Sequence, residues 1–455
     1  MTTTNAPFEA QIAEWRAYVS TRHTAGSPQP AASEAQLRAH LAALSAAGLS
    51  ADEAFLIALK RVGSSDAPTH DFAGTHAAQL WHQPPSDPGA ALAPTRAKEL
   101  RGVLAFATAA ALAVKAPVLF GIPLSPDADP PLFYLRNASL FVFPLLAAYL
   151  MWHRAPNARK ALTLTLAFAA GGYFANAYLF ADSSHTALLA ILHLPIALWL
   201  AVGFAHVRGA WFANSARMQF VRFSGELAIY CVLIALGGIV LAGFTSIMFT
   251  AINTNSAWFV AGWLIPCGAA GTVIIAAWLV ESKQSVIGNL APMLTRLFTP
   301  LFTILLLVFL ATMLWTGSPI NVERELLISL DLMLAVVVGL VLYAASARSP
   351  QAAPGFFDGL QLLLVASALA VDGIALWAIL ARISGFGFTP NRVAALGENL
   401  ILLVNLAGSA GLYWRFVFRR APFATLEHWQ LAYLPVYSAW AAVVVAVFPP
   451  LFGYQ

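Results

Sequence analysis

Long, nearly uninterrupted runs of apolar residues fill the chain from Arg101 to its end. Eleven of them approach or exceed the roughly 20 residues with which an α-helix crosses about 30 Å of hydrocarbon. The pattern therefore predicts an all-α fold, a polytopic transmembrane helix bundle of about eleven spans. The expected spans are 102–123, 132–152, 161–181, 186–206, 226–249, 258–280, 296–316, 325–345, 358–382, 395–417 and 430–452.

Residues 1–81 carry a different pattern, in which apolar residues recur at helical spacing within polar segments. Ser33 with Gln36, and Ser50 with Glu53, have the spacing of capping boxes and predict two helix starts. Further helices are expected over 8–22 and 71–81. The expected core is Phe8, Ile12, Trp15, Val19, Leu37, Leu41, Leu44, Phe55, Leu56, Leu59, Val62, Phe72, Leu80 and Trp81. A unit of about 80 residues has a marginal core, so we expect a small helical domain that leans on a partner or on the membrane surface.

The segment between these two regions is rich in proline. Four prolines between Gln83 and Thr95 predict a linker. The expected organisation is therefore a helical domain at 1–81, a linker at 82–100 and a transmembrane domain at 101–455. The N-terminus lacks a basic stretch followed by an apolar core, so we do not expect it to be a signal peptide.

Composition and charge agree with a membrane protein. Hydrophobic residues make up 59% of the chain, charged residues only 10%, and the mean hydropathy is +0.72; soluble domains have about 25% charged residues. Lys and Arg mark cytoplasmic loops, and an N-terminus in the cytoplasm places twelve of them inside and four outside. The inner set is Arg154, Arg159, Lys160, Arg208, Arg217, Arg222, Lys283, Arg296, Arg348, Arg415, Arg419 and Arg420, and the outer set is Arg136, Arg324, Arg382 and Arg392. We therefore expect a multi-pass protein of the bacterial inner membrane with a cytoplasmic N-terminus and an extracytoplasmic C-terminus.

Motifs for catalysis or cofactor binding are missing from the sequence. It contains no G-x-x-x-x-G-K-[ST], H-E-x-x-H, C-x-x-C or G-x-S-x-G, and no basic stripe typical of nucleic-acid binding. His70, His76 and His82 recur every six residues, which scatters them around a helix. Cys231 and Cys267 lie in apolar runs and are expected to be small buried hydrophobes. We expect no cofactor, no metal, no nucleic-acid partner and no enzymatic activity.

The informative residues are polar groups inside the expected spans, because burying them in hydrocarbon is costly. Lys115, Asp331 and Asp372 are the ionisable residues away from the span ends, about 12, 9 and 15 Å from the outer end by helical rise. Asn176, His193 and Asn405 are expected at similar depths. The inner half offers fewer such groups. This distribution predicts an outward-facing polar cavity or a buried ionic cluster.

Each of these residues also has a purely structural interpretation. Lys115 either extends to the outer surface or pairs with Asp331 or Asp372; because an unpaired charge costs at least about 2.5 kcal/mol, we expect the pair. His193 precedes Leu194-Pro195 and is expected to bond a freed backbone carbonyl rather than relay protons. Asp372 lies near mid-membrane and must be paired or protonated.

Two stretches resemble known families. The segment from Leu37 through Gly48-Leu-Ser-Ala-Asp-Glu-Ala-Phe to Gly63, with Phe72 and Leu80-Trp81, resembles the permease prefix domain of bacterial permeases. The segment 382–392, Arg-Ile-Ser-Gly-Phe-Gly-Phe-Thr-Pro-Asn-Arg, resembles the signature loop of a bacterial inner-membrane family catalogued as domain of unknown function 4153. This resemblance implies a membrane protein of unestablished activity. ATP-coupled permeases that share the prefix have few spans and a large extracytoplasmic domain, which this chain lacks.

The second stretch also has a physical interpretation as an interhelical turn. Gly385 and Gly387 permit a tight turn, and Thr389-Pro390 can start a helix. Arg382 and Arg392 flank it at the outer interface. An ordinary turn and a functional element are equally compatible with the sequence.

Two functions fit these features. The first is a permease-like protein that transports or senses a small solute through a polar site in the outer half of the bundle. The second is a non-transporting membrane regulator whose residues 1–81 bind a cytoplasmic partner. A water-accessible cavity that reaches Asp372 favours transport, whereas a dry, close-packed bundle favours regulation. A membrane-embedded enzyme has no supporting motif.

Overall fold

A computed structural model of the 455-residue chain describes residues 8–21, 30–46, 51–62, 69, 72, 88–124, 132–153, 158–180, 184–251, 257–282, 290–316, 324–348, 351–419 and 421–454. Contacts divide the chain into two compact units, Met1–Lys98 and Glu99–Gln455. Every regular element in the described part of the chain is a helix.

The first unit contains α1 (Glu9–Thr21), α2 (Pro30–Ala46) and α3 (Ala51–Val62). Their apolar faces form one core, which holds eleven of the expected residues: Phe8, Ile12, Trp15, Val19, Leu37, Leu41, Leu44, Phe55, Leu59, Val62 and Phe72. Leu56 is only half-buried. Leu80, Trp81, the other residues of the fourth expected helix except Phe72, and the three regularly spaced histidines lie outside the described residues.

The start of α2 differs from the sequence expectation. α2 begins at Pro30, so Ser33 lies inside its first turn and not at the N-cap. Proline is well suited to the first helical position because its missing N–H has no partner there in any case. The start of α3 agrees with the expectation to within a residue, although Ser50 itself is outside the described part.

Ion pairs fasten α1 to α2. The Arg38 guanidinium donates to both Glu9 oxygens, at 2.6 and 3.1 Å, and Arg16 Nε donates to Glu34 Oε2 at 2.8 Å. The hydrogen bond from Arg38 holds the pKa of Glu9 below its usual value, and the hydrogen bond from Arg16 does the same for the pKa of Glu34.

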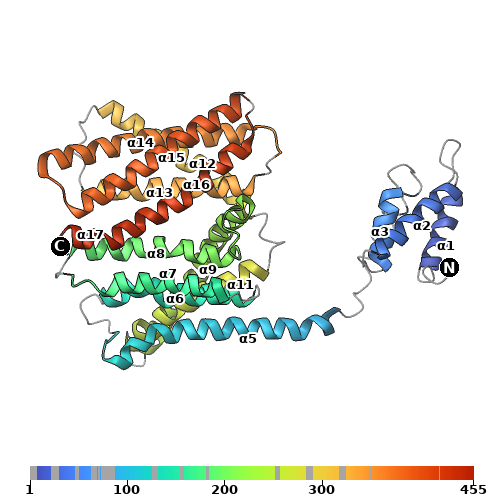
Figure 1. The fold of residues 1–455 in the computed structure, drawn as a ribbon, viewed down its shortest axis with the longest axis horizontal. Coiled ribbons are helices and arrows are strands. Elements are labelled where there is room, and N and C mark those ends of the chain that lie inside the picture. Colours follow the sequence, from blue (N-terminus) through green and yellow to red (C-terminus); the bar gives the residue numbers. More distant parts are fainter. Residues whose placement is uncertain are drawn as a thin grey trace. The chain divides into compact units, whose positions relative to one another are not determined.

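The second unit holds the long apolar helices (Figure 1). They are α5 (Pro88–Lys115), α6 (Leu132–His153), α7 (Ala158–Asn176), α8 (His185–His206), α9 (Asn214–Ala251), α11 (Ile265–Ser282), α12 (Leu290–Thr316), α13 (Arg324–Ala347), α14 (Phe356–Phe386), α15 (Pro390–Arg419) and α16 (Phe423–Ala446). Short elements η2 (Ala116–Phe120), α10 (Ala257–Phe259), η3 (Val260–Leu264) and α17 (Phe448–Leu451) complete it. Among the described residues, ten helical segments are long and apolar enough to cross a membrane, which fits a multi-pass integral membrane protein.

α7 is a helix where a span was expected at 161–181, but it is not among these ten segments. An exact count of eleven spans is therefore not confirmed. The expected linker at 82–100 also differs, because α5 is helical from Pro88 onward and joins the last part of that segment to the first span.

Two groups of helices make up the second unit, and each has its own core. One core is formed mainly by α5, α6, α7, α8, α9 and α11, and the other by α12, α13, α14, α15 and α16. Both also draw on α9, and α16 lies along α8 where the groups meet (Figure 1). This division matters for the polar residues, because Lys115 belongs to the first group and both aspartates to the second.

Candidate functional site

Three helices of the second group bring acidic side chains together, of which Asp372 is buried and Asp331 and Glu398 are half-buried. Asp331 comes from α13, Asp372 from α14, and Glu398 and its neighbour Asn399 from α15. α14 packs against both α13 and α15, and these two also touch each other. We call these four residues the carboxylate site.

Asp331 is the centre of the carboxylate site. Its Oδ1 accepts a hydrogen bond of 2.9 Å from Asn399 Nδ2. Asp372 and Glu398 are each electrostatic neighbours of the Asp331 carboxyl group. None of the ion pairs found among the described residues involves any of them. The site therefore collects carboxyl groups for which the described residues provide no basic partner.

Asp372 is the most unusual member. It is 0% exposed, and neither carboxylate oxygen has a hydrogen-bond partner. Asn399 is also 0% exposed; its nitrogen donates to Asp331 and to the Ala395 carbonyl, while its Oδ1 has no donor. Buried polar groups in native structures are nearly all hydrogen-bonded, and an isolated carboxylate in hydrocarbon is very costly. These unpartnered oxygens indicate that the carboxylate site has a role beyond the packing of the helices.

The expected ion pair of Lys115 is wrong. Lys115 ends α5 and places its ammonium 4.3 Å from the ring centre of Trp263 in η3. A cation over an aromatic face is a stable arrangement at a membrane interface, so the lysine has a local solution that the sequence did not reveal. The two aspartates lie in the other helical group and must be accommodated without it.

The remaining polar residues do not join the carboxylate site. Asn176 and Asn137 exchange two amide hydrogen bonds of 2.8 and 2.9 Å between the end of α7 and the start of α6. His193 Nδ1 lies 2.8 Å from the Leu189 carbonyl. A backbone carbonyl partner was expected for His193. The observed partner is the Leu189 carbonyl, and not the carbonyl that lacks its helical donor because of Pro195. The polar residues that were expected to share one site therefore make separate local contacts.

Asn405 belongs to a network between α15 and α16. Its Nδ2 donates to the Tyr437 hydroxyl, and its Oδ1 accepts from Trp429 Nε1 at 3.0 Å and from Ser409 Oγ at 3.2 Å. Gln430 Nε2 in turn donates to Ser409 Oγ. Because both amide atoms of Asn405 have hydrogen-bond partners, we interpret this network as a structural contact that holds the two helices together.

The segment 382–392 is a turn with internal contacts. α14 ends at Phe386, Gly387 has a φ of +76°, and Pro390 begins α15. Arg392 Nη1 donates to the carbonyls of Phe386 and Gly387 at 2.9 and 2.8 Å, which satisfies the end of α14. Thr389 Oγ1 accepts from the Arg392 backbone at 3.4 Å.

Two residues of this segment lie elsewhere than expected. Arg382 and Gly385 are inside α14, and only Gly387 provides the positive φ of the turn. The turn interpretation therefore accounts for Gly387, Thr389, Pro390 and Arg392.

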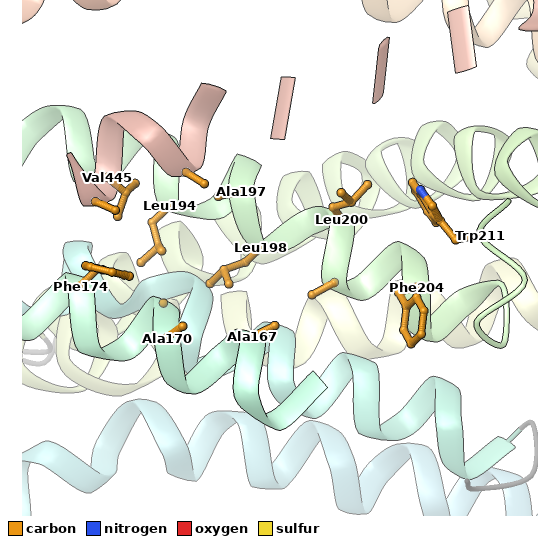
Figure 2. A pocket seen from close by; sticks show the side chains of 14 residues that line it. Ala167, Ala170, Phe174, Leu194, Ala197, Leu198, Leu200, Phe204, Trp211 and Val445 are labelled. Carbon is orange, nitrogen blue, oxygen red and sulfur yellow. The ribbon is translucent and has the colours of Figure 1, made fainter. Parts of the chain in front are cut away.

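A cavity lies in the other half of the unit. It has a volume of about 400 Å³ and is lined by α7, α8 and α16, with Phe174 and Val445 at one end and Phe204 and Trp211 at the other (Figure 2). A second cavity of about 360 Å³ lies on another side of α8 and is lined by Trp199, Phe220 and seven other residues. Both linings are almost wholly apolar, and neither includes the carboxylate site. A water-accessible path to Asp372, the feature that would favour transport over regulation, is not present in these two cavities.

The sequence analysis missed Glu398 and Asn399. Glu398 was overlooked because the span was expected to start at 395, which puts this glutamate at the interface. α15 starts at Pro390, so Glu398 lies eight residues, about 12 Å, inside the helix. A proline at the first helical position was the signal that could have moved that boundary.

The site chemistry does not match a metal centre. Among the described residues, no group of three or more His, Cys, Asp or Glu side chains is arranged to hold a metal ion. Cys231 and Cys267 are free and half-buried, not fully buried as expected, and Cys267 Sγ lies 3.7 Å from the Ala111 carbonyl. What the arrangement offers chemically is a set of carboxyl groups that can take up or release protons.

Comparisons with protein-family models, with curated proteins and with solved structures find no match to this chain.

Proposed function

We propose that the chain is a permease-like integral membrane protein that transports or senses a small solute, and that the carboxylate site is its functional centre. The observation that carries this proposal is Asp372, a fully buried carboxyl group with no hydrogen-bond partner inside an apolar bundle. Ionisable groups within membrane spans are costly and usually serve a substrate or ion pathway. The ten apolar helical segments supply the membrane setting.

The closed state of the site limits how it can work. Asp372 is 0% exposed, so a solute or water reaches it only after the helices around it move. α13, α14 and α15 surround the site, and α14 joins α15 through the short turn at Gly387. We therefore propose that these helices open the site by moving against α12 and α16.

The regulator remains the second candidate, and the closed packing around Asp372 favours it. A bundle in which Asp372 is buried and the two cavities are apolar is what a non-transporting protein needs. In that function the first unit, with its own core, binds a cytoplasmic partner and the carboxylate site senses a signal.

For the topology we propose eleven spans, with α7 as the additional one. Lys160, near the start of α7, donates to the Arg208 carbonyl just after α8, and Asn176 at its end bonds Asn137 at the start of α6. α7 thus runs between the same two levels as α6 and α8. With the basic residues counted above, eleven spans support a cytoplasmic N-terminus and an extracytoplasmic C-terminus in a bacterial inner membrane.

A thermal-shift screen tests the function. Purified protein in detergent is screened against a library of small metabolites, and compounds that raise its Tm are tested for uptake into proteoliposomes. We expect at least one compound to raise the Tm of the wild type and of Lys115→Met, which lies outside the site, but not of Asp372→Asn. Uptake supports transport, and binding without uptake supports sensing. Equal stabilisation of all three proteins would refute the carboxylate site as the centre.

A further inference from the structure

The carboxylate site holds more buried acceptor oxygens than donors. Both oxygens of Asp372 and the amide oxygen of Asn399 are buried without a partner, while the single described donor to Asp331 is Asn399 Nδ2. Leaving a buried acceptor without a donor costs about 1–3 kcal/mol, and more when the group is charged. Three such oxygens in one part of the bundle call for an occupant that supplies positive charge or a donated hydrogen.

Among the side chains that the structure describes, none that faces the site supplies this charge. α12, α13 and α15 pack against α14. From α13 comes Asp331 and from α15 comes Glu398, both acidic. α12 offers Arg296, which is exposed and lies three residues before Thr299, whose hydroxyl accepts from Gln361. Gln361 is eleven residues before Asp372 on α14, about 16 Å away by helical rise.

Four other basic residues with described side chains are distant from the site or engaged elsewhere. Arg382 is ten residues, about 15 Å, further along α14 than Asp372. Arg392 donates to the carbonyls at the end of α14, and Arg348 pairs with Asp358 at 2.8 Å. Lys115 contacts Trp263 in the other helical group.

We propose that the occupant is a proton, so that Asp372 is a neutral carboxylic acid in the closed bundle and the carboxylate site takes up and releases protons as it opens. This proposal rests on the proposed function and names its coupling ion. A proton neutralises one carboxylate without further ligands, whereas a metal ion needs several oxygens converging on one point, an arrangement not found among the described acidic, histidine and cysteine side chains.

Chemical labelling in native membranes tests the protonation state. Dicyclohexylcarbodiimide, an apolar reagent, adds to protonated carboxyl groups, and mass spectrometry locates the product. Asp358 is the matched control, because it is buried too but paired with Arg348. We expect Asp372 to be labelled at least about tenfold more than Asp358 at neutral pH, which corresponds to about 1.4 kcal/mol in favour of the protonated form. Labelling of Asp372 should rise further as the pH falls.

A second measurement covers the case in which the reagent does not reach the site. Infrared difference spectra of the wild type against Asp372→Asn should contain the C=O band of a protonated carboxylic acid, and the difference against Asp358→Asn should contain only carboxylate bands. The proposal is overturned if that band is missing at every pH at which the protein stays folded. It is also overturned if Na⁺ suppresses both the band and the labelling at constant pH, which would identify a metal cation as the occupant. A protonated Asp372 in a protein that binds and transports no solute would refute the proposed function and leave the proton site intact.

Discussion

The same substitution, aspartate to asparagine, should have opposite consequences at two buried positions. Asp358 and Asp372 both lie on α14 and both are buried. Asp358 accepts from Arg348 Nε at 2.8 Å and Nη2 at 3.3 Å, and its Oδ2 accepts from the Gly355 backbone at 2.8 Å. Asp372 accepts nothing. The substitution removes an ion pair at the first position and an unpartnered acid at the second.

The loss of stability expected at position 358 depends on the contacts that Arg348 retains after the substitution. Breaking a buried ion pair costs about 3–5 kcal/mol, and the side chains of this pair are 13% and 10% exposed. Asparagine retains one acceptor, and Arg348 still donates to the carbonyls of Ala352 and Ala353 and lies over two phenylalanine rings. We therefore expect Asp358→Asn to lower the free energy of unfolding by about 2 kcal/mol. Asp372→Asn should change it by less than about 0.5 kcal/mol, or raise it, because no partner is lost.

Tryptophan fluorescence during heating provides the assay, since the chain has 13 tryptophans. Unfolding of large proteins is often irreversible, so the two variants and the wild type are compared as Tm values at one scan rate in one detergent. A clear drop for Asp358→Asn and none for Asp372→Asn is expected. If Asp372→Asn lowers the Tm as much as Asp358→Asn does, Asp372 has a stabilising partner and the reasoning about its isolation is refuted.

Three further predictions concern other parts of the chain. Gly408→Ala should destabilise the bundle by about 1–3 kcal/mol, the range for overpacking, because an added Cβ would come within 2.2 Å of the Trp429 ring. Gly411→Ala is the control, since its added Cβ meets no atom within 4 Å and should be tolerated. Thermal unfolding of both variants tests this. Residues 1–81 expressed alone should be helical but weakly stable, and their stability should fall as the pH drops below about 4.3. The reason is that the Arg16 hydrogen bond lowers the pKa of Glu34 in the folded state, and its contribution to stability is lost when Glu34 is protonated. Circular dichroism that stays unchanged down to strongly acid pH would contradict this prediction. A reporter fused to the C-terminus should report the extracytoplasmic side, and a cytoplasmic signal would mean that α7 does not cross.

Apolar patterning was sufficient to predict the helices and much of the first core. Phe8, Ile12, Trp15 and Val19 recur at helical spacing, and all four are buried in the core of α1, α2 and α3. Periodicity works here because burial of one helical face depends on spacing along a single helix. Helix ends were less predictable, since proline at the first position of α2, α5 and α15 extended each helix beyond its expected start.

The partners of buried polar residues could not be predicted from depth alone. Lys115 and Asp372 have similar expected depths, yet they belong to different helical groups. Depth constrains one coordinate of a side chain, whereas pairing depends on which helices are neighbours and on how each is rotated. The local partners Trp263 for Lys115 and Asn137 for Asn176 follow from that packing. The sequence identified Asp331 and Asp372 as costly residues but could not show that Asp331 accepts a hydrogen bond from Asn399 and lies near Asp372 and Glu398.

The central claim is that the acidic residues of α13, α14 and α15 share one site from which Lys115 is excluded. Cysteine cross-linking in native membranes tests it most directly, in a background in which Cys231 and Cys267, the two cysteines of the chain, are replaced by alanine. With the short thiol cross-linker dibromobimane, the pair Asp331→Cys and Asn399→Cys should form a linked peptide detectable by mass spectrometry, because the native side chains are 2.9 Å apart. The pair Lys115→Cys and Asp372→Cys should not. A link in the second pair and none in the first would contradict the arrangement and restore the ion pair that the sequence alone favoured.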